Sequence, residues 1–326
     1  MIKISDEAQK VLEIIKRHGP VRPTEIVKTL NISIKTTYKH LAKLLDENLI
    51  EKTGTTPMVF YAEKNEIKKN LIKPDKDDQA INENYIYVSP SGEMIRGIAG
   101  FRTWCQKNKF DIQKEKKVFL EKFRTFQKLK KNGLVSAKKS ILSKNKKLYL
   151  DNIFFSDFYT IGHFGKTKLG QLVYLGKSSQ NKILISEIAE IVRPMILNII
   201  KKYNIKLICF IPPTIDRRIQ FMEIFRKKLD LKLPEITALK VSSLTKVPQK
   251  TLRQLEDRII NTNKTIAISP AQKIASNVLI IDDATGSGAT LNETANKIRA
   301  IALKNIKIIG YSVVGSYKGF DVISEV

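Results

Sequence analysis

The chain has 326 residues, of which 42% are apolar, and its 58 Lys and Arg against 32 Asp and Glu give a formal net charge of +26. That length is enough for two or three domains with buried cores. Two distant cysteines exclude a disulfide framework or a thiolate zinc site, and no run approaches the ~18 apolar residues of a membrane span. The N-terminus is charged where a signal peptide needs an apolar segment. We therefore expect a cytoplasmic protein without membrane contact.

The positive charge favours a polyanionic partner, DNA or a structured nucleic acid above all. A surface that is merely rich in solvated lysine would give the same excess, so both interpretations stay open at this point.

Residues 1–64 have the pattern of three helices followed by a short hairpin. Ser5 can cap the first helix, which is expected to stop at Gly19-Pro20, and a second helix is expected over about Thr24–Leu30. A third helix begins after Ser33. Its buried stripe is predicted to be Thr37, Leu41, Leu44 and Leu45. The hairpin is predicted to turn near Gly54.

The stretch from Val21 to Ile50 resembles the winged-helix DNA-binding domains of bacterial regulators. The resemblance implies that the third helix enters the major groove. The side chains expected to touch nucleic acid lie off the buried stripe or on the wing: Lys35, Thr36, Tyr38, Lys39, Lys52 and Thr55. A winged helix that binds a protein partner remains an alternative. Residues 1–64 hold 11 Lys and Arg against 8 Asp and Glu, which is a small excess of basic residues for a DNA-binding domain.

The middle of the chain is predicted to be a polar linker over residues 65–84 and a basic, mainly helical region over residues 85–150. A small hairpin is expected near its start, with the turn at Ser89-Pro90-Ser91-Gly92. Residues 101–150 hold 16 Lys and Arg against 3 Asp and Glu. Phe119, Phe123, Phe126 and Leu129 recur at helical spacing, which predicts one apolar and one lysine-rich face. The lysine-rich face could bind a phosphate backbone or simply be solvated over a local core.

Residues 151–326 alternate apolar strand-like runs with helical patterns, which predicts a mostly parallel α/β domain. The run Val278–Ile281 is expected to be a buried strand, and a helical pattern follows from Thr294. The whole chain is therefore predicted to be a multidomain α/β protein, with an N-terminal winged helix, a central basic helical segment and a C-terminal α/β domain.

The stretch Val278 to Leu291, with its sequence IIDDATGSGAT, resembles the phosphoribosyl diphosphate (PRPP) binding motif of type I phosphoribosyltransferases. Carboxylates at the strand tip, here Asp282 and Asp283, would accept hydrogen bonds from the ribose hydroxyls. The loop would wrap the 5′-phosphate with its backbone and hydroxyl groups: Ala284, Thr285, Gly286, Ser287, Gly288, Ala289 and Thr290. Many relatives have Thr where this chain has Gly286, so one hydroxyl donor is missing.

Two further segments resemble ComF-like members of the same family. The resemblance implies that Thr214–Arg218 form the pyrophosphate loop, with Arg217 and Arg218 as candidate catalytic cations, although a solvated basic turn stays open. It places Lys240, Lys246 and Lys250 on or beside a loop that closes over the ligand. Mg²⁺ would enter with PRPP rather than on ligands of its own. An acceptor would bind near residues 154–176, where His163 is either a base or, as we favour, a structural residue.

Three functions stay open on the sequence. The first is a phosphoribosyltransferase that also binds nucleic acid, with pyrophosphate released from PRPP. The second is a non-catalytic regulator that senses PRPP and binds DNA through the winged helix. The third is an effector of a retron-type defence system. Phosphoribosyltransferase-like proteins with winged-helix domains resemble the partner proteins found in some of those systems. A homo-oligomer is compatible with each of them.

Overall fold

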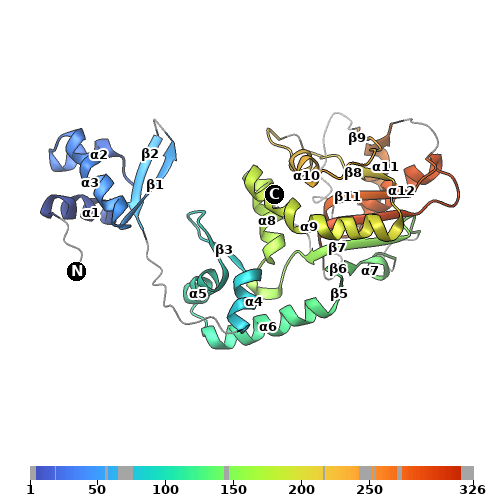
Figure 1. Cartoon of the computed structure of the whole chain (residues 1–326), viewed down its shortest axis with the longest axis horizontal. Coiled ribbons are helices and arrows are strands. Elements are labelled where there is room, and N and C mark those ends of the chain that lie inside the picture. Colours follow the sequence, from blue (N-terminus) through green and yellow to red (C-terminus); the bar gives the residue numbers. More distant parts are fainter. Residues whose placement is uncertain are drawn as a thin grey trace. The chain divides into compact units, whose positions relative to one another are not determined.

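The computed structural model describes residues 5–18, 20–55, 58–64, 76–142, 147–215, 217–241, 252, 254–269 and 274–316. The chain divides into two compact units, residues 1–73 and 74–326 (Figure 1). None of the helices in these described ranges is both long and apolar enough to cross a membrane.

The first unit is a winged helix. Three helices precede an antiparallel pair of strands: α1 (Asp6–His18), α2 (Pro23–Leu30), α3 (Ile34–Asp46), β1 (Ile50–Thr55) and β2 (Met58–Glu63). As predicted, the Oγ atoms of Ser5 and Ser33 cap α1 and α3, accepting from the N–H groups of Ala8 and Thr36 at 3.3 Å and 3.0 Å. The stripe of α3 is buried at Thr37, Leu41 and Leu44 and half-buried at Leu45.

Gly54 lies within β1, opposite Val59, and the ladder continues to the pair Thr55–Met58. Residues 56–57, which join the two strands next to the predicted turn, lie outside the described residues.

The second unit starts with α4 (Lys76–Asn84), a hairpin of β3 (Ile86–Val88) and β4 (Met94–Arg96), and then α5 (Gly97–Lys107) and α6 (Ile112–Lys128). The hairpin turns at the predicted place, with Gly92 at φ 86°. The linker prediction is wrong for residues 76–84, because α4 buries Ile81 completely against a cluster that includes Phe101 and Phe119. Residues 65–75 of that prediction lie outside the described residues.

The rest of the unit is built on one mixed sheet and the helices beside it. Its elements are β5 (Lys130–Lys131), β6 (Leu134–Ser136), α7 (Lys138–Leu142), β7 (Asn152–Phe158), the 3₁₀ turn η1 (Gly162–Phe164), α8 (Lys168–Ser178), α9 (Lys182–Tyr203), β8 (Leu207–Phe210), α10 (Phe221–Leu229), β9 (Ala238–Lys240), α11 (Leu255–Thr265), β10 (Ile266–Ile268), β11 (Val278–Thr285), α12 (Ala289–Ile301) and β12 (Ile308–Gly315). The strand order is β5-β6-β7-β12-β11-β8, with β9 and β10 forming a separate antiparallel pair.

The predicted parallel α/β domain is confirmed by strands β7, β12, β11 and β8, which are mutually parallel. Two expectations are wrong in detail. Residues 130–136 form β5 and β6, antiparallel strands that extend this sheet, instead of continuing a helical region. The sequence of residues 152–182 also predicts paired strands around its glycines, whereas the structure has one strand, η1 and α8 there.

Helices cover both faces of the sheet, as the alternation of β11 requires. Leu279 and Ile281 face a core shared with α8, α9 and α10, whereas Val278 and Ile280 face a second core shared with α7 and α12. All four side chains are fully buried. Cys209 on β8 is a core residue, and its burial raises the pKa of its thiol to about 12, so it stays a protonated thiol.

Candidate phosphate-binding site

Asp282 and Asp283 lie on β11 just beyond the point where this strand stops pairing with β8. Pairing with β8 ends at Ile281, whereas pairing with β12 continues to Thr285. Strand β11 is therefore longer than predicted, and Asp282 and Asp283 fall within it, at a point where one strand edge is open. Ligands of α/β proteins bind at this carboxyl end of parallel strands.

A lysine that sequence reasoning missed contacts this acid pair. Lys177, at the end of α8, places its Nζ 2.6 Å from Oδ2 of Asp283. The backbone carbonyl of Lys177 accepts a hydrogen bond from the guanidinium of Arg217. The C-terminal end of α8 and the residues after it therefore connect the acid pair to the predicted pyrophosphate loop. Gln180 adds a second contact, because its side-chain oxygen accepts a hydrogen bond from the N–H of Ile219 at 2.8 Å.

The environment of Asp282 favours its protonated form. Burial first, and then the charge of Asp283, raise the pKa of Asp282 to about 7, against the opposing effects of Lys177 and Lys240. The N–H of Asp283 donates to Oδ1 of Asp282 at 2.8 Å. Burial lowers the pKa of Lys240 on β9, although the charge of Asp282 raises it. The predicted residue Lys240 is therefore close enough to interact with the acid pair.

A pH-dependent stability follows from the raised pKa of Asp282. The folded protein keeps this proton while the unfolded chain, whose carboxyl has its ordinary pKa of 3.8, has lost it. The free energy of unfolding therefore falls as the pH rises from about 4 to about 7, and the full cost is present above that range. We expect Asp282→Asn to be more stable than wild type by about 1–2 kcal/mol near pH 8, and by progressively less as the pH falls through that range.

Urea unfolding of ligand-free protein across that pH range checks the expectation. The control is Asp257→Asn, which changes an exposed carboxyl of α11 and should alter stability little at any pH. An Asp282→Asn variant that is less stable than wild type near pH 8 would show that the ionised Asp282 carboxylate does not lower the free energy of unfolding.

The small-residue loop leads directly into α12. Residues Gly286–Gly288 form the turn, and Ala289 and Thr290 open the helix, whose first N–H groups have no partner within the helix. Gly288 has φ 75°, and its backbone lies under the side chain of Ile141 from α7. Ser287 is buried, and its Oγ accepts from the N–H of Ala289 at 3.4 Å. The acid pair and the loop are thus consecutive at the same end of β11.

The other predicted residues of the domain fall in three groups. Arg218 is exposed, in the same loop as the half-buried Arg217. Lys246 and Lys250 lie outside the described residues. His163 on η1 pairs with Glu115, with 2.7 Å between Nε2 and Oε2, and its ring packs against Phe164 and Trp104. These contacts support the structural interpretation of His163.

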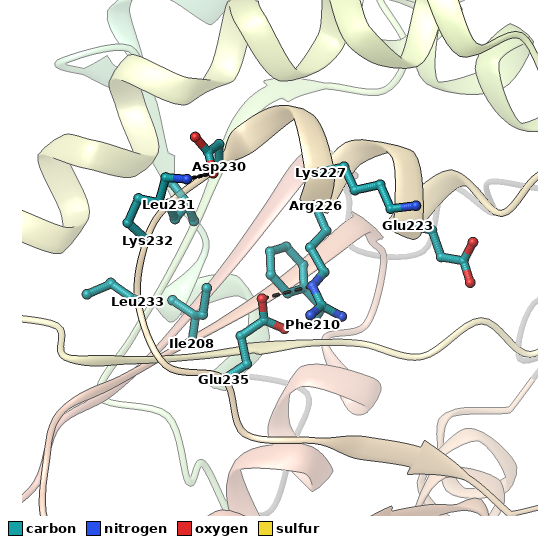
Figure 2. A pocket seen from close by; sticks show the side chains of 10 residues that line it. All are labelled: Ile208, Phe210, Glu223, Arg226, Lys227, Asp230, Leu231, Lys232, Leu233 and Glu235. Carbon is teal, nitrogen blue, oxygen red and sulfur yellow. Dashed lines mark hydrogen bonds and ion pairs between the residues drawn. The ribbon is translucent and has the colours of Figure 1, made fainter.

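A separate pocket of about 490 Å³ lies beside the edge strand β8, between α10 and residues 230–235 (Figure 2). Its charges are compensated internally, because Arg226 pairs with Glu235 at 2.8 Å and Lys232 with Asp230 at 2.8 Å. None of the predicted site residues lines it, so we place the candidate site at the acid pair instead.

On α3 of the winged helix, the side chains of Lys35, Tyr38 and Lys39 are exposed, as the prediction of a groove-facing surface requires. Lys52 is exposed on β1. Thr36 is half-buried, and its hydroxyl lies 2.8 Å from Oγ of Ser33, so it belongs to the helix cap as much as to the surface. Nothing is described of the Thr55 side chain.

Taken with the parallel sheet, the acid pair and the glycine-containing loop define a phosphoribosyltransferase-like domain, which follows a winged helix in the chain. Comparison with known families agrees in both places. Residues 166–326 match the PRTase-CE family, and residues 4–55 match the MarR family. The chain therefore combines a MarR-like winged helix with a phosphoribosyltransferase-like domain.

Among solved structures, the chain is similar to a hypoxanthine phosphoribosyltransferase from Staphylococcus aureus in two crystal forms. Sequence identity is 16% and 17%, and TM-scores are 0.23 and 0.24. The alignments cover 39% and 40% of this chain and 62% and 63% of that enzyme. No protein of curated function matches the sequence.

Proposed function

We propose that the phosphoribosyltransferase-like domain binds PRPP together with Mg²⁺ at the carboxyl end of β11. The observation that carries the proposal is the meeting of opposite charges there. Asp282 and Asp283 lie next to the small-residue loop, and the amine of Lys177 contacts Asp283. Lys240 is near enough to lower the pKa of Asp282, and Arg217 contacts the backbone of Lys177. A ligand with two hydroxyls, a phosphate and a diphosphate needs both kinds of group.

Each part of PRPP has a candidate partner. The carboxylates of Asp282 and Asp283 would accept hydrogen bonds from the ribose 2′- and 3′-hydroxyls. The 5′-phosphate would lie on the loop 284–290, against the amides that open α12. The diphosphate would lie toward Arg217, Arg218 and Lys240. Lys177 neutralises Asp283 when no ligand is bound, and its amine would turn to the ligand when the ribose takes its place.

Mg²⁺ fits this donor set as a partner of the ligand. The described residues contain no group of three or more His, Cys, Asp or Glu side chains placed to hold a metal ion. Mg²⁺ is usually bound by one or two carboxylates and by substrate phosphates, which Asp282, Asp283 and the diphosphate would provide. When bound, Mg²⁺ neutralises charge on the diphosphate.

The reaction that this arrangement supports is substitution at the anomeric carbon of the ribose. The bond from that carbon to the diphosphate oxygen breaks, an acceptor nucleophile takes its place, and pyrophosphate leaves. The ring becomes oxocarbenium-like, so the neighbouring carboxylates stabilise positive charge while Arg217, Arg218 and Lys240 stabilise the leaving group. Pyrophosphate release, measured over a panel of bases, nucleotides and amines, tests the transfer.

We also propose that α3 binds DNA. Removing two exposed charges, Lys35→Gln with Lys39→Gln, should weaken binding and lower the slope of log K against log salt by about 2. The control, Lys10→Gln with Arg17→Gln, removes two exposed charges of α1. Titration of labelled duplex at several salt concentrations checks this, and equal slopes for the two variants would argue for a protein-binding winged helix.

A second candidate, a PRPP sensor without catalysis, is favoured by two observations. Gly286 lacks the hydroxyl that many relatives have, and Asp283 is already neutralised by Lys177. A sensor should release no pyrophosphate with any acceptor, while PRPP should change the affinity for DNA by about 5–150-fold, the usual range of allosteric coupling. Release of pyrophosphate with any acceptor would exclude it.

A further inference from the structure

A row of basic side chains runs along the outer face of α6. Lys114, Lys117, Arg124 and Lys128, here called the α6 stripe, are all exposed. Residues three or four apart share one face of a helix, so these four and Glu121 form one line. At 1.5 Å per residue the line is about 21 Å long. In Figure 1, α6 forms an outer edge of the second unit, with α4 and α5 on its other side.

The inner face of α6 packs against the protein's own core. Phe119 and Leu120 are 1% and 3% exposed and pack with Ile81, Tyr85 and Phe101 of the neighbouring elements. An amphipathic helix that binds a lipid surface needs its apolar face free to insert. Because this face is already buried, an anionic membrane does not fit the α6 stripe.

Most nearby carboxylates are used within the unit. Asp111 caps α6 by accepting the N–H of Lys114 at 2.7 Å, and Glu115 pairs with His163. Asp77 and Asp78 of α4 pair with Arg124 and Lys116 at 2.9 Å and 2.8 Å. Within α6 this leaves Glu121 as an exposed carboxylate among the bases of the stripe. The face is therefore complementary to a chain of negative charges.

An aromatic ring stands at the N-terminal end of the stripe. Phe110 is 42% exposed, and its ring centroid lies 5.2 Å from that of Trp104. Exposed Lys107 and Lys109 are its neighbours in the chain. Basic residues that follow a phosphate backbone, together with an aromatic ring on which a base can stack, are the combination that binds single-stranded nucleic acid.

We propose that the α6 stripe and Phe110 form a binding surface for single-stranded nucleic acid, in addition to the winged helix. The lysines contact successive phosphates, and Phe110 stacks with a base at one end. This surface depends on neither PRPP binding nor on α3, so it can be tested in the full chain with both of those sites unchanged.

The main test removes charge from the stripe without touching the core. In the full chain, Lys114→Gln, Lys117→Gln and Lys128→Gln are combined, and the control combines Lys201→Gln, Lys228→Gln and Lys304→Gln, three exposed lysines elsewhere in the same unit. Binding of a labelled, mixed-sequence DNA strand is measured by anisotropy over a range of salt. The stripe variant should lower the slope of log K against log salt by about 2, at about 0.7 for each phosphate that a lysine no longer neutralises.

The protein holds its own local probe. Trp104 is the only tryptophan of the sequence, and it lies beside Phe110. Its emission should change when the strand binds to wild type, and should not change for the stripe variant at the same strand concentration. Phe110→Ala should weaken binding of the single strand by about 5–100-fold and leave duplex binding unaltered, because paired bases cannot stack on the ring. Equal melting temperatures for all variants confirm that the fold is kept.

Three results would overturn the proposal. The stripe variant could bind as the control does, with Lys35→Gln and Lys39→Gln alone abolishing binding, which would place all nucleic acid on α3. Phe110→Ala could weaken duplex and single strand alike, which would remove the single-strand assignment. The stripe variant could lose binding to phosphatidylserine vesicles while keeping its affinity for the strand, which would make the surface a lipid site.

Discussion

Replacing Arg217 with alanine is expected to lower the rate of pyrophosphate release from PRPP by about 10²–10³, the usual cost of removing one group that stabilises transition-state charge. The leaving diphosphate gains negative charge as its bond to the ribose breaks. Arg217 also donates a hydrogen bond to the carbonyl of Lys177, whose amine contacts Asp283. In the proposed site, the change therefore removes one cation from the diphosphate and loosens the position of Lys177 beside the ribose.

Two variants make this result specific. Arg217→Lys keeps the charge but loses the planar fork, and should recover only part of the rate. Arg226→Ala removes an exposed arginine of α10 that pairs with Glu235, and should leave the rate close to wild type. A continuous assay for pyrophosphate at saturating PRPP measures all three. Undiminished release by Arg217→Ala would show that this loop does not hold the leaving group.

A methyl group at position 288 is expected to destabilise the fold by about 2–5 kcal/mol, from a left-handed backbone cost of about 1–2 and an overpacking cost of about 1–3. Gly288 has φ 75°, and an added Cβ would lie 2.7 Å and 2.8 Å from side-chain atoms of Ile141. Ile141 is 2% exposed, so it has little room to move. Gly288→Ala should also displace the loop and weaken PRPP binding.

Gly92 supplies the control, because its φ is also positive, at 86°, and an added Cβ would meet nothing within 4 Å. Gly92→Ala should therefore cost only the backbone part, about 1–2 kcal/mol. Combining Gly288→Ala with Ile141→Val should recover part of the steric cost. Urea unfolding measures all four proteins. Equal losses for Gly288→Ala and Gly92→Ala would mean that Ile141 does not restrict the space at position 288.

The part of the site that is contiguous in sequence could be predicted from it. Asp282 and Asp283 follow a run of four apolar residues, and the loop and the start of α12 come next, so strand, turn and helix are specified locally. The length of β11 could not be predicted, because pairing with β12 extends the strand to Thr285, and that is a long-range interaction.

Lys177 could not be found in this way. It lies near the end of an ordinary helix, and only the packing of α8 against β12 and β7 brings its amine to Asp283. The same reasoning applies to α4, whose burial of Ile81 depends on α5 and α6, and to β5 and β6, whose short runs become strands by pairing with each other and with β7. In each case tertiary contacts outweighed a weak local pattern.

The most direct test of the central claim is a calorimetric titration of the full chain with PRPP in the presence of Mg²⁺. Wild type should bind with saturation at one site, and Asp282→Asn combined with Asp283→Asn should show no heat of binding while keeping a folded state. Ribose 5-phosphate should bind more weakly than PRPP, because it lacks the diphosphate that we propose to lie toward Arg217 and Lys240. Wild-type binding that persists unchanged in the double variant, or no binding of PRPP to wild type at millimolar concentration, would contradict the account.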